Sequence, residues 1–456
     1  MSVIDTVAAV STPRGKGGIA VIRISGESTR EILQRVFCPR GRDPVAHPRH
    51  AAFGEIRRPT GEVLDEGIAL FFAAPHSFTG EDVAEISCHG GPLLTETVLC
   101  AVLEAGAVPA SPGEFTARAL MNGKMQLTEA EALGALLDAD TEGRLALARA
   151  GMEGRLSHAV QALYERACHI LADIFAKVDF PDEDLNSMGT EELSLALSAL
   201  LHDVRTLAAT WRTGYAVANG VDTVICGPVN AGKSTLYNAL VGREAAIVTD
   251  VAGTTRDVLS ETVSLGAVTL RLSDTAGLRE TEDAVERIGV DRAEEAIGRA
   301  ELVLAVFDAS READAGTLTL IERLKKVEGT VVAVLNKQDR TPRLDRTLLA
   351  SISHVVEISA ATGEIEPLKQ LVERLYLQEG LDIRHDAIVA NARQHAALVR
   401  AAEALDRALE ALHEGISLDA VCVEAELAMS ALGGVNGREV DEDIIAELFS
   451  HFCVGK

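Results

Sequence analysis

The sequence predicts a multidomain protein that combines α/β and all-α parts. An N-terminal α/β domain is followed by a discontinuous helical domain, into which a P-loop α/β domain is inserted. Three observations predict this: short apolar runs between Gly- and Pro-rich turns near the start, helical periodicity on both sides of the centre, and a phosphate-binding motif between the two helical stretches. A length of 456 residues suits several domains. We expect the divisions 1–117, 118–216, 217–376 and 377–456.

The first 117 residues carry the pattern of an α/β domain. Short runs rich in Val, Ile and Phe are separated by glycines and prolines, which is typical of strands joined by turns. We expect strands over residues 7–10, 19–24, 69–72 and 83–87, and one helix over 27–37.

From residue 127 the pattern becomes helical. Thr128 and Glu131 have the spacing of a capping box, which would begin a helix. Apolar residues then recur every three or four positions from 145 to 174, which indicates one buried stripe. Because neither helical block looks sufficient for a core of its own, we expect the two to pack together. The remaining helices are expected over 189–214, 386–414 and 419–432.

The segment 227–234 reads G-x-x-x-x-G-K-S, the pattern of a phosphate-binding loop. An apolar run that reads as a strand precedes it, and a helical stretch follows, so that backbone N–H groups would face phosphates at a helix N-terminus. Lys233 would reach the β- and γ-phosphates, and the Ser234 hydroxyl would bind Mg²⁺. A plain glycine turn is the alternative, but strand, loop and helix together favour a nucleoside triphosphate. The residues expected at the nucleotide are Asn230, Ala231, Gly232, Lys233, Ser234 and Thr235.

The base of the nucleotide is predicted by N-K-x-D, at Asn336, Lys337 and Asp339, after the apolar run 331–335. Ligands bind at the carboxyl ends of strands in open α/β sheets. A carboxylate at Asp339 accepts hydrogen bonds from the N1–H and 2-amino groups of guanine, and adenine offers no such pair. The loop expected to close over the base comprises Ser359, Ala360 and Ala361.

Two further segments are expected to respond to the γ-phosphate. Asp274 would hold Mg²⁺ through water, and the Gly277 N–H would sense the phosphate. Thr255 would be the second protein ligand of Mg²⁺. Four motifs in this order predict a GTP-binding domain of the Ras-like kind. The residues of the two segments are Thr249, Asp250, Val251, Ala252, Gly253, Thr254 and Thr255, then Asp274, Thr275, Ala276 and Gly277.

Leu278 stands where Ras-like proteins place a water-orienting Gln. An apolar side chain cannot orient water, so catalysis must come from elsewhere. The side-chain oxygen of Asn230 could ligate a monovalent cation between the phosphates and so neutralise charge as an arginine finger does. The alternative is that Asn230 only stabilises the loop. We predict hydrolysis that depends on K⁺, which equal rates in KCl and NaCl would contradict.

Motifs also lie outside the P-loop domain, and with them the chain resembles the MnmE (TrmE) family of tRNA-modification GTPases along essentially its whole length. The segments that carry this resemblance are 5–6, 17–18, 23–26, 77–82, 89–92, 112–115, 179–181, 246–250, 253–257 and 452–456.

The resemblance implies roles for particular residues. It assigns the general base or water-orienting glutamate to Glu286, although the residues alone do not separate it from Glu280 or Glu282. Cys453 is either a nucleophile or a small buried residue, and we favour a structural or site-lining role. The implied K⁺ ligands are Asn230, Thr249, Val251 and Thr254.

The resemblance also implies that the N-terminal domain binds a 5-formyl- or methylene-tetrahydrofolate. Arg23, Glu85 and Lys124 would hold it, with Lys456 approaching from a partner subunit. A glutamate can pair with the amino edge of a pterin, and Arg and Lys can hold carboxylates. When each of these residues is considered alone, the alternative to folate binding is an ordinary surface salt bridge.

The function that follows from the resemblance is a K⁺-activated, Mg²⁺-dependent GTPase that acts on tRNA. As a homodimer, in a heterotetramer or larger complex with a flavin-bearing partner of the MnmG (GidA) type, it would add an aminomethyl or carboxymethylaminomethyl group to carbon 5 of the wobble uridine. A ribosome-assembly or signalling switch would share the GTPase core but lack the outer segments. A folate-dependent one-carbon transferase with a regulatory GTPase is the third interpretation.

Composition limits the partners and the compartment. A formal charge of −26 argues against a broad basic surface, so tRNA would need local patches such as residues 14–16, or a basic partner. Seven cysteines without a C-x-x-C pair indicate neither a disulfide framework nor a zinc site. We expect a cytoplasmic protein with no membrane segment, because the sequence shows no 18-residue apolar run and no secretory pattern.

Overall fold

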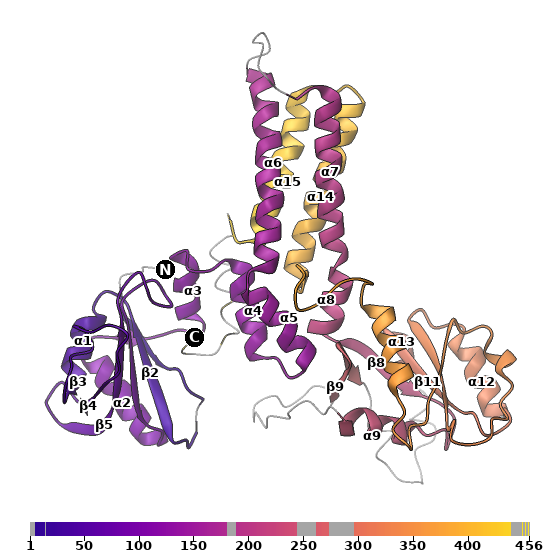
Figure 1. Cartoon of the computed structure of the whole chain (residues 1–456), viewed down its shortest axis with the longest axis horizontal. Coiled ribbons are helices and arrows are strands. Elements are labelled where there is room, and N and C mark those ends of the chain that lie inside the picture. Colours follow the sequence, from indigo (N-terminus) through magenta and orange to yellow (C-terminus); the bar gives the residue numbers. More distant parts are fainter. Residues whose placement is uncertain are drawn as a thin grey trace. The chain divides into compact units, whose positions relative to one another are not determined.

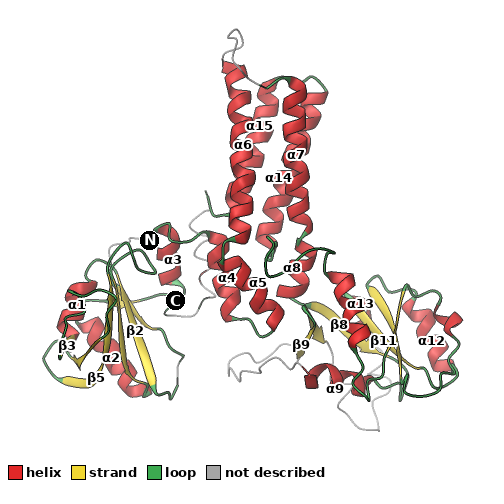
Figure 2. Ribbon diagram, viewed as in Figure 1, coloured by secondary structure: helices red, strands yellow, loops and turns green. Residues whose placement is uncertain are grey.

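The computed structural model describes residues 5–13, 15–179, 188–243, 261–272 and 296–438, with the single residues 449, 452 and 455. The chain forms two compact units (Figure 1). Unit 1 comprises residues 1–134 and 436–456, and unit 2 comprises residues 135–435. α/β and all-α parts are therefore combined in one chain, as the sequence predicts (Figure 2).

A seven-stranded sheet in the order β3-β4-β5-β6-β2-β1-β7 forms the centre of unit 1. All neighbours are antiparallel except β1 and β7. Alternate residues of the strands face helices α1 and α2 and form a core with them, which fits the period of two. The elements are β1 Val7–Val10, β2 Ile19–Ser25, α1 Thr29–Val36, β3 Phe37–Pro39, β4 Ala52–Arg57, β5 Val63–Phe72, β6 Val83–His89, α2 Pro92–Glu104, β7 Val108–Pro109 and α3 Glu114–Met121.

Helix α4, Leu127–Leu137, begins differently from the prediction. The backbone N–H of Gln126 donates to Glu129 Oε2 at 3.1 Å, so the capping contact lies two residues before the predicted one. Thr128 lies inside the helix, and its buried hydroxyl has no hydrogen-bond partner among the described residues. The predicted capping box is therefore wrong, because the helix starts before Thr128.

Residues near the end of the chain pack into unit 1 rather than with the helical domain. Phe449 is 3% exposed and lies against Gly113, where an added Cβ would stand 2.9 Å from both the Cβ and the carbonyl oxygen of Phe449. The Ser11 hydroxyl donates to the Gly455 carbonyl at 3.0 Å. The expected segment 377–456 is thus divided between the two units, because its last apolar residues find their core beside α3 and α4.

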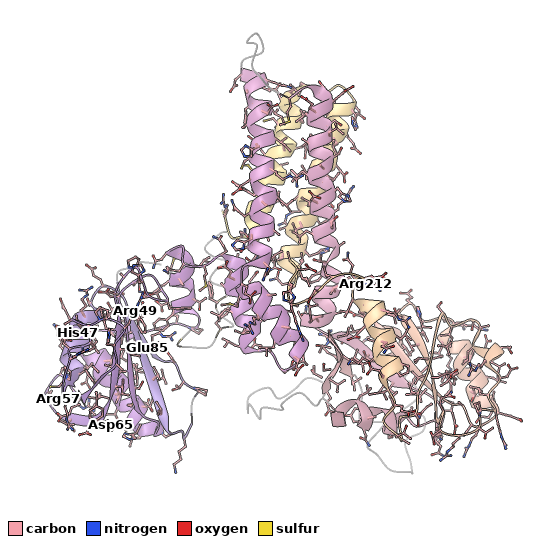
Figure 3. All side chains as sticks on the ribbon, viewed as in Figure 1. His47, Arg49, Arg57, Asp65, Glu85 and Arg212 are labelled. Carbon is pink, nitrogen blue, oxygen red and sulfur yellow. The ribbon has the colours of Figure 1, made fainter. Side chains whose placement is uncertain are left out.

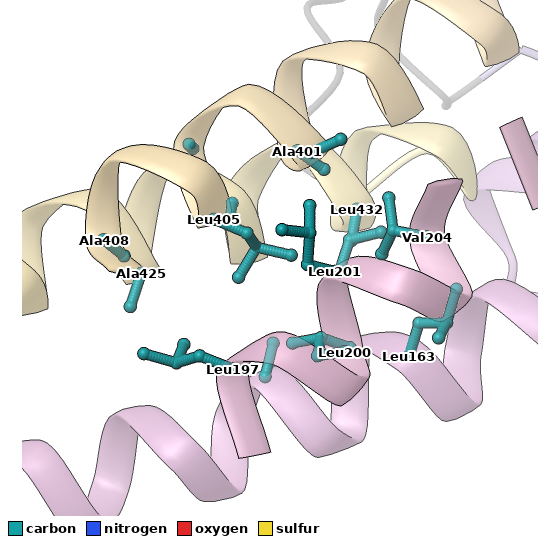
Figure 4. Close-up of a cluster of buried hydrophobic side chains, with 14 of the residues drawn as sticks. Leu163, Leu197, Leu200, Leu201, Val204, Ala401, Leu405, Ala408, Ala425 and Leu432 are labelled. Atoms are coloured by element: carbon teal, nitrogen blue, oxygen red, sulfur yellow. The ribbon is translucent and has the colours of Figure 1, made fainter. Parts of the chain in front are cut away.

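The helical part of unit 2 joins segments that are far apart in the sequence. Residues from α6, α7, α14 and α15 share one hydrophobic cluster, as Leu163, Leu200, Leu405 and Leu432 illustrate (Figure 4). The expectation that the two helical blocks pack together is confirmed. The helices are α5 Glu142–Met152, α6 Arg155–Asp179, α7 Thr190–Ala209, α8 Trp211–Ala218, α14 Ala392–His413 and α15 Leu418–Val435.

The predicted single stripe from 145 to 174 is carried by two helices, α5 and α6. The chain turns between them at Gly154, whose φ of 75° lies in the left-handed region. The apolar spacing continues across this turn, so periodicity alone does not reveal it.

A six-stranded sheet in the order β13-β12-β11-β8-β10-β9 forms the rest of unit 2. Every pair is parallel except β9 with β10. The central strands β11 and β12 are almost entirely apolar and buried, as expected for a parallel sheet covered on both faces. The elements are β8 Val221–Cys226, α9 Lys233–Arg243, β9 Glu261–Leu265, β10 Val268–Leu272, β11 Leu302–Asp308, α12 Ala315–Leu324, β12 Thr330–Asn336, a 3₁₀ turn Arg346–Leu349, β13 His354–Glu357 and α13 Glu366–Tyr376.

Candidate functional site

The predicted nucleotide-binding segments meet at one edge of the second sheet. Strands β8, β11, β12 and β13 run parallel, so their carboxyl ends share that edge. The described segments that follow these strands are 227–234 after β8, 308–310 after β11, 336–339 after β12 and 358–361 after β13. This is where open α/β sheets bind ligands.

The backbone of the P-loop requires glycine at two positions. Gly227 has φ 152°, and a Cβ there would stand 2.3 Å from the Val306 carbonyl oxygen. Gly232 has φ 101°, and its Cβ would stand 2.2 Å from Asn336 Nδ2. Side chains are therefore excluded where the loop approaches β11 and the N-K-x-D segment, which explains the glycine spacing.

Lys233 begins α9 and folds back over the P-loop. Its Nζ donates to the carbonyl oxygens of Gly227 and Pro228, both at 2.9 Å. Burial lowers the pKa of the Lys233 ammonium and raises the pKa of the neighbouring Cys226 thiol to about 12. The ammonium is thus held over the loop, where an anionic phosphate would meet it, and no carboxylate of the described residues forms an ion pair with it.

Asn336 joins the P-loop to the loop after β13. Its Nδ2 donates to the Ala231 carbonyl at 3.1 Å, and its Oδ1 accepts from the Ala360 N–H at 3.0 Å. The side chain is buried, with 2% exposure. Asn336 therefore fixes the spacing between the phosphate and base segments rather than facing a ligand.

Lys337 makes a second connection to the P-loop. Its backbone is left-handed, with φ 67°, and its Nζ donates to the Asn230 carbonyl at 2.7 Å and to Asp308 Oδ2 at 2.6 Å. Burial alone would raise the pKa of Asp308, but the hydrogen bonds from Lys337 and Ser310 outweigh it and lower that pKa. Sequence reasoning missed Asp308, whose only signal is a polar residue at the end of a buried strand.

Asp339, the residue predicted to read guanine, is hydrogen-bonded to Ser359. The Ser359 hydroxyl donates to Asp339 Oδ1 at 2.7 Å, while the carboxylate keeps about a third of its surface exposed, at 34%. One oxygen is thereby oriented, and the carboxylate remains open to solvent. The other predicted contacts with exposed side chains at this edge are Asn230, Ser234, Thr235 and Ala361.

Several predicted residues lie outside the described residues, and their roles stay predictions. They are Thr249, Asp250, Val251, Ala252, Gly253, Thr254, Thr255, Asp274, Thr275, Ala276, Gly277, Glu286, Cys453 and Lys456.

In unit 1, Arg23 and Glu85 are directly opposed on β2 and β6. Arg23 Nε and Nη2 both donate to Glu85 Oε1, at 2.9 and 2.8 Å. The guanidinium lies 5.7 Å from the ring centres of both Phe78 and Phe115. The cation of this ion pair therefore lies near two aromatic rings. The Arg23 side chain is 21% exposed and the Glu85 side chain 24% exposed. The Lys124 Nζ donates to the Pro75 carbonyl at 3.0 Å.

A buried ionic network that sequence reasoning missed supports the Arg23 surroundings. Arg118, 4% exposed, donates to Glu114 Oε1 at 2.8 Å and to both oxygens of Glu81, at 3.1 and 3.2 Å. Glu81 also accepts from the Ser25 hydroxyl at 2.7 Å. The network thereby ties the segment that carries Phe78 to the helix that carries Phe115. The i,i+4 spacing of Glu114 and Arg118 was the available signal.

Gly455 lies beside β1 of its own chain, because a Cβ on it would stand 2.3 Å from the Val10 carbonyl oxygen. The approach of the adjacent Lys456 from a partner subunit stays a prediction.

In the described ranges, no set of three or more His, Cys, Asp or Glu side chains is arranged to hold a metal ion. Within the same ranges, none of the helices combines the length and apolar character needed to cross a membrane.

Comparison with known proteins gives matches along the chain. The family "GTP-binding protein TrmE N-terminus" matches residues 6–124, and the family "MnmE helical domain" matches residues 127–453. Proteins named tRNA modification GTPase MnmE are 40% identical in Heliobacterium modesticaldum and 39% identical in Symbiobacterium thermophilum, each over 99% of both chains. The G domain of the T. maritima FeoB iron transporter covers 35% of this chain and 99% of its own, with 27% identity and a TM-score of 0.26, too low to support a conclusion.

The two family matches reach from residue 6 to residue 453, and the relatives align along almost the whole chain at about 40% identity. This chain belongs to the MnmE (TrmE) family of tRNA modification GTPases.

Proposed function

We propose that this protein hydrolyses GTP in the service of tRNA modification, at carbon 5 of the wobble uridine. One observation carries the GTPase part: the P-loop lysine and the open carboxylate of Asp339 lie at the same sheet edge, and Asn336 links their loops. The tRNA part is supported by the relatives, whose name is tRNA modification GTPase MnmE.

Binding would begin with the guanine base. The exposed part of the Asp339 carboxylate would accept from N1–H and the 2-amino group, while Ser359 orients one oxygen. Adenine would leave these acceptors unpaired, which costs affinity. Lys337 would keep the P-loop in register with the base, because it already bonds the Asn230 carbonyl.

The phosphates would replace the carbonyl contacts of Lys233 and be surrounded by the N–H groups of the P-loop. Ser234, at the start of α9, would provide one Mg²⁺ ligand, with Thr255 as a second and Asp274 through water. The hydroxyl and carboxylate oxygens of this set suit Mg²⁺, which neutralises phosphate charge when bound.

Hydrolysis would use K⁺ and Glu286. Asn230 supports this part, because its backbone is left-handed, with φ 62°, and its side chain is exposed at the P-loop. Its partners at K⁺ would be Thr249, Val251 and Thr254. We expect faster hydrolysis in KCl than in NaCl at equal ionic strength, and loss of this difference in Asn230→Ala.

A folate cofactor would bind in unit 1. The Arg23–Glu85 pair between Phe78 and Phe115 supports this, because a flat pterin can stack on the rings while its amino edge meets the carboxylate. The folate carboxylates would pair with Lys124 and Lys456. We expect Glu85→Gln to weaken binding of 5-formyl-tetrahydrofolate in an equilibrium titration.

The wider assembly is proposed from the family. A homodimer would work with a flavoprotein of the MnmG (GidA) type, in a heterotetramer or larger complex, on tRNA in the cytoplasm.

The deciding experiment is mass spectrometry of tRNA nucleosides from cells that lack this chain. We expect loss of the aminomethyl-type uridines, with rescue by wild type and none by Asp274→Ala, which removes the proposed Mg²⁺ contact. An unchanged profile would refute the tRNA role and favour a ribosome-assembly or signalling switch, whereas rescue by Asp274→Ala would refute its dependence on GTP.

A further inference from the structure

Some guanidinium groups of unit 1 are neutralised by carboxylates. Arg40 is paired with Glu55 at 3.0 Å and also with Glu66, and Arg57 is paired with Glu55. These arginines have strong anionic partners within the domain. They therefore carry little net charge that could attract a further anion.

Two other cations in unit 1 have no such partner. Arg49 Nη2 donates to the His76 carbonyl at 3.1 Å, and Lys124 Nζ donates to the Pro75 carbonyl at 3.0 Å. Both side chains belong to exposed residues, and no described carboxylate forms an ion pair with either. Main-chain carbonyls orient a cation without cancelling its charge. We call Arg49, Lys124 and the segment 74–76 between them the cationic rim.

The fold holds Arg49 in an uncommon conformation. Its φ is 64°, in the left-handed region that non-glycine residues other than Asn and Asp rarely adopt. The Arg49 N–H donates to the Phe71 carbonyl at 2.8 Å, which anchors the residue to β5. Backbone strain of this kind is found preferentially at functional sites.

The segment 74–76 of the cationic rim leads to Phe78, whose ring centre lies 5.7 Å from the Arg23 guanidinium. Phe71, which anchors Arg49, pairs with Ala84 on β6, directly before Glu85. In Figure 3, His47, Arg49 and Glu85 lie towards one end of unit 1, and Arg57 and Asp65 lie towards the other. Arg49 therefore lies towards the same end of unit 1 as Glu85, whereas the carboxylate-paired Arg57 lies towards the other end.

We propose that Arg49 of the cationic rim binds a backbone phosphate of the RNA next to the uridine that is modified, beside the folate carboxylates that Lys124 would hold. This inference rests on the proposed function and locates the RNA on the chain. With a formal charge of −26, most of the surface repels a polyanion, so approach requires local cations that no carboxylate neutralises. Phosphate contacts of this kind position RNA without reading its sequence.

The test is equilibrium binding of tRNA to the full chain over a range of KCl concentrations. The plot of log K against log[KCl] has a negative slope, and each lost phosphate contact reduces its steepness by about 1. We expect this loss for Arg49→Asn, because asparagine tolerates the left-handed backbone, and recovery of the slope in Arg49→Lys, which restores the charge. Arg40→Asn is the matched control, with the same charge change at a carboxylate-paired arginine, and should keep the wild-type slope.

Three outcomes would overturn the proposal. In the first, the wild-type chain does not bind tRNA, and in the second, the slope is equally steep for wild type and Arg49→Asn. In the third outcome, Arg49→Asn and Arg40→Asn reduce the steepness of the slope by the same amount. A parallel titration with 5-formyl-tetrahydrofolate separates RNA phosphate from folate carboxylate as the ligand. If Arg49→Asn weakens folate binding and leaves tRNA binding unchanged, the rim belongs to the cofactor. Failure of the tRNA role itself would appear separately, as an unchanged nucleoside profile in cells without the chain.

Discussion

At the scale of single residues, we expect Asp339 to determine which base the site accepts. Asp339→Asn replaces an acceptor oxygen by an amino group, which matches the carbonyl at position 2 of xanthine and clashes electrostatically with the 2-amino group of guanine. Hydrogen bonds to charged groups contribute about 1.5–3 kcal/mol, so we expect GTP affinity to fall roughly 10- to 100-fold while XTP affinity rises. Competition between GTP and XTP for a fluorescent nucleotide measures the change. If the affinities for GTP and XTP fell together, the assignment of Asp339 to guanine recognition would be contradicted.

The Asp308–Lys337 pair gives the nucleotide-binding domain a pH dependence. Because the pKa of Asp308 is lowered in the folded protein, its stabilising effect is present above the unfolded value, about 3.9, and is lost as pH falls through the folded value. We expect the stability difference between wild type and Asp308→Asn to shrink below about pH 4. Hydrogen exchange of the β11 and β12 amides at several pH values measures it. A difference that grows on acidification would refute the role of this carboxylate.

Local patterns in the sequence single out residues that the fold brings together. The P-loop and N-K-x-D spacings identified Lys233, Asn336 and Asp339, which the fold brings to one sheet edge. Sequence alone did not show that Asn336 is a buried connector, nor that Arg118 bonds Glu81 across 37 positions of the chain. Such contacts depend on tertiary structure, and no periodicity signals them.

At the scale of elements, the first turn of α5 packs closely on the turn between β9 and β10. A Cβ on Gly143 would stand 2.5 Å from the Ala267 carbonyl oxygen. We expect Gly143→Ala to separate these elements and destabilise their contact by about 1–3 kcal/mol, as overpacking does. Faster hydrogen exchange in β9 and β10 would report it.

Gly242→Ala is the matched control for this change. Gly242 is exposed on α9, and a Cβ there meets nothing within 4 Å. Alanine favours helix over glycine, so this variant should be neutral or slightly stabilising. Equal rates of hydrogen exchange in Gly143→Ala and Gly242→Ala would show that α5 is not in close contact with the β9–β10 turn.

Strands β8 and β12 of the second sheet could be predicted to within a few residues because their apolar runs end at the P-loop and at N-K-x-D. The helix boundaries were harder to predict. The apolar stripe from 145 to 174 continues through the turn at Gly154, so the pattern did not reveal that two helices, α5 and α6, carry it. A helix boundary of this kind is set by one backbone angle rather than by the apolar pattern.

At the scale of the whole molecule, Phe449 connects sequence ends that lie far apart. Replacing a buried phenylalanine by alanine costs about 3–5 kcal/mol, so we expect Phe449→Ala to destabilise unit 1 and leave unit 2 unchanged. Hydrogen exchange of β1 and β2 compared with α14 measures the two effects. Phe53→Ala, at a side chain that is 50% exposed, is the control and should change little. Equal destabilisation of both units by Phe449→Ala would refute this assignment.

The packing of Phe449, Phe452 and Gly455 into unit 1 also affects how the chain is made. A ribosome releases residues 1–134 first, yet residues 449, 452 and 455, which pack against them, are synthesised only after the whole of unit 2. The strands of the first sheet can therefore pair early, whereas the docking beside α3 and α4 must wait until these residues have left the ribosome. A nascent chain stalled in α15 should carry a protease-sensitive N-terminal domain that becomes resistant upon release.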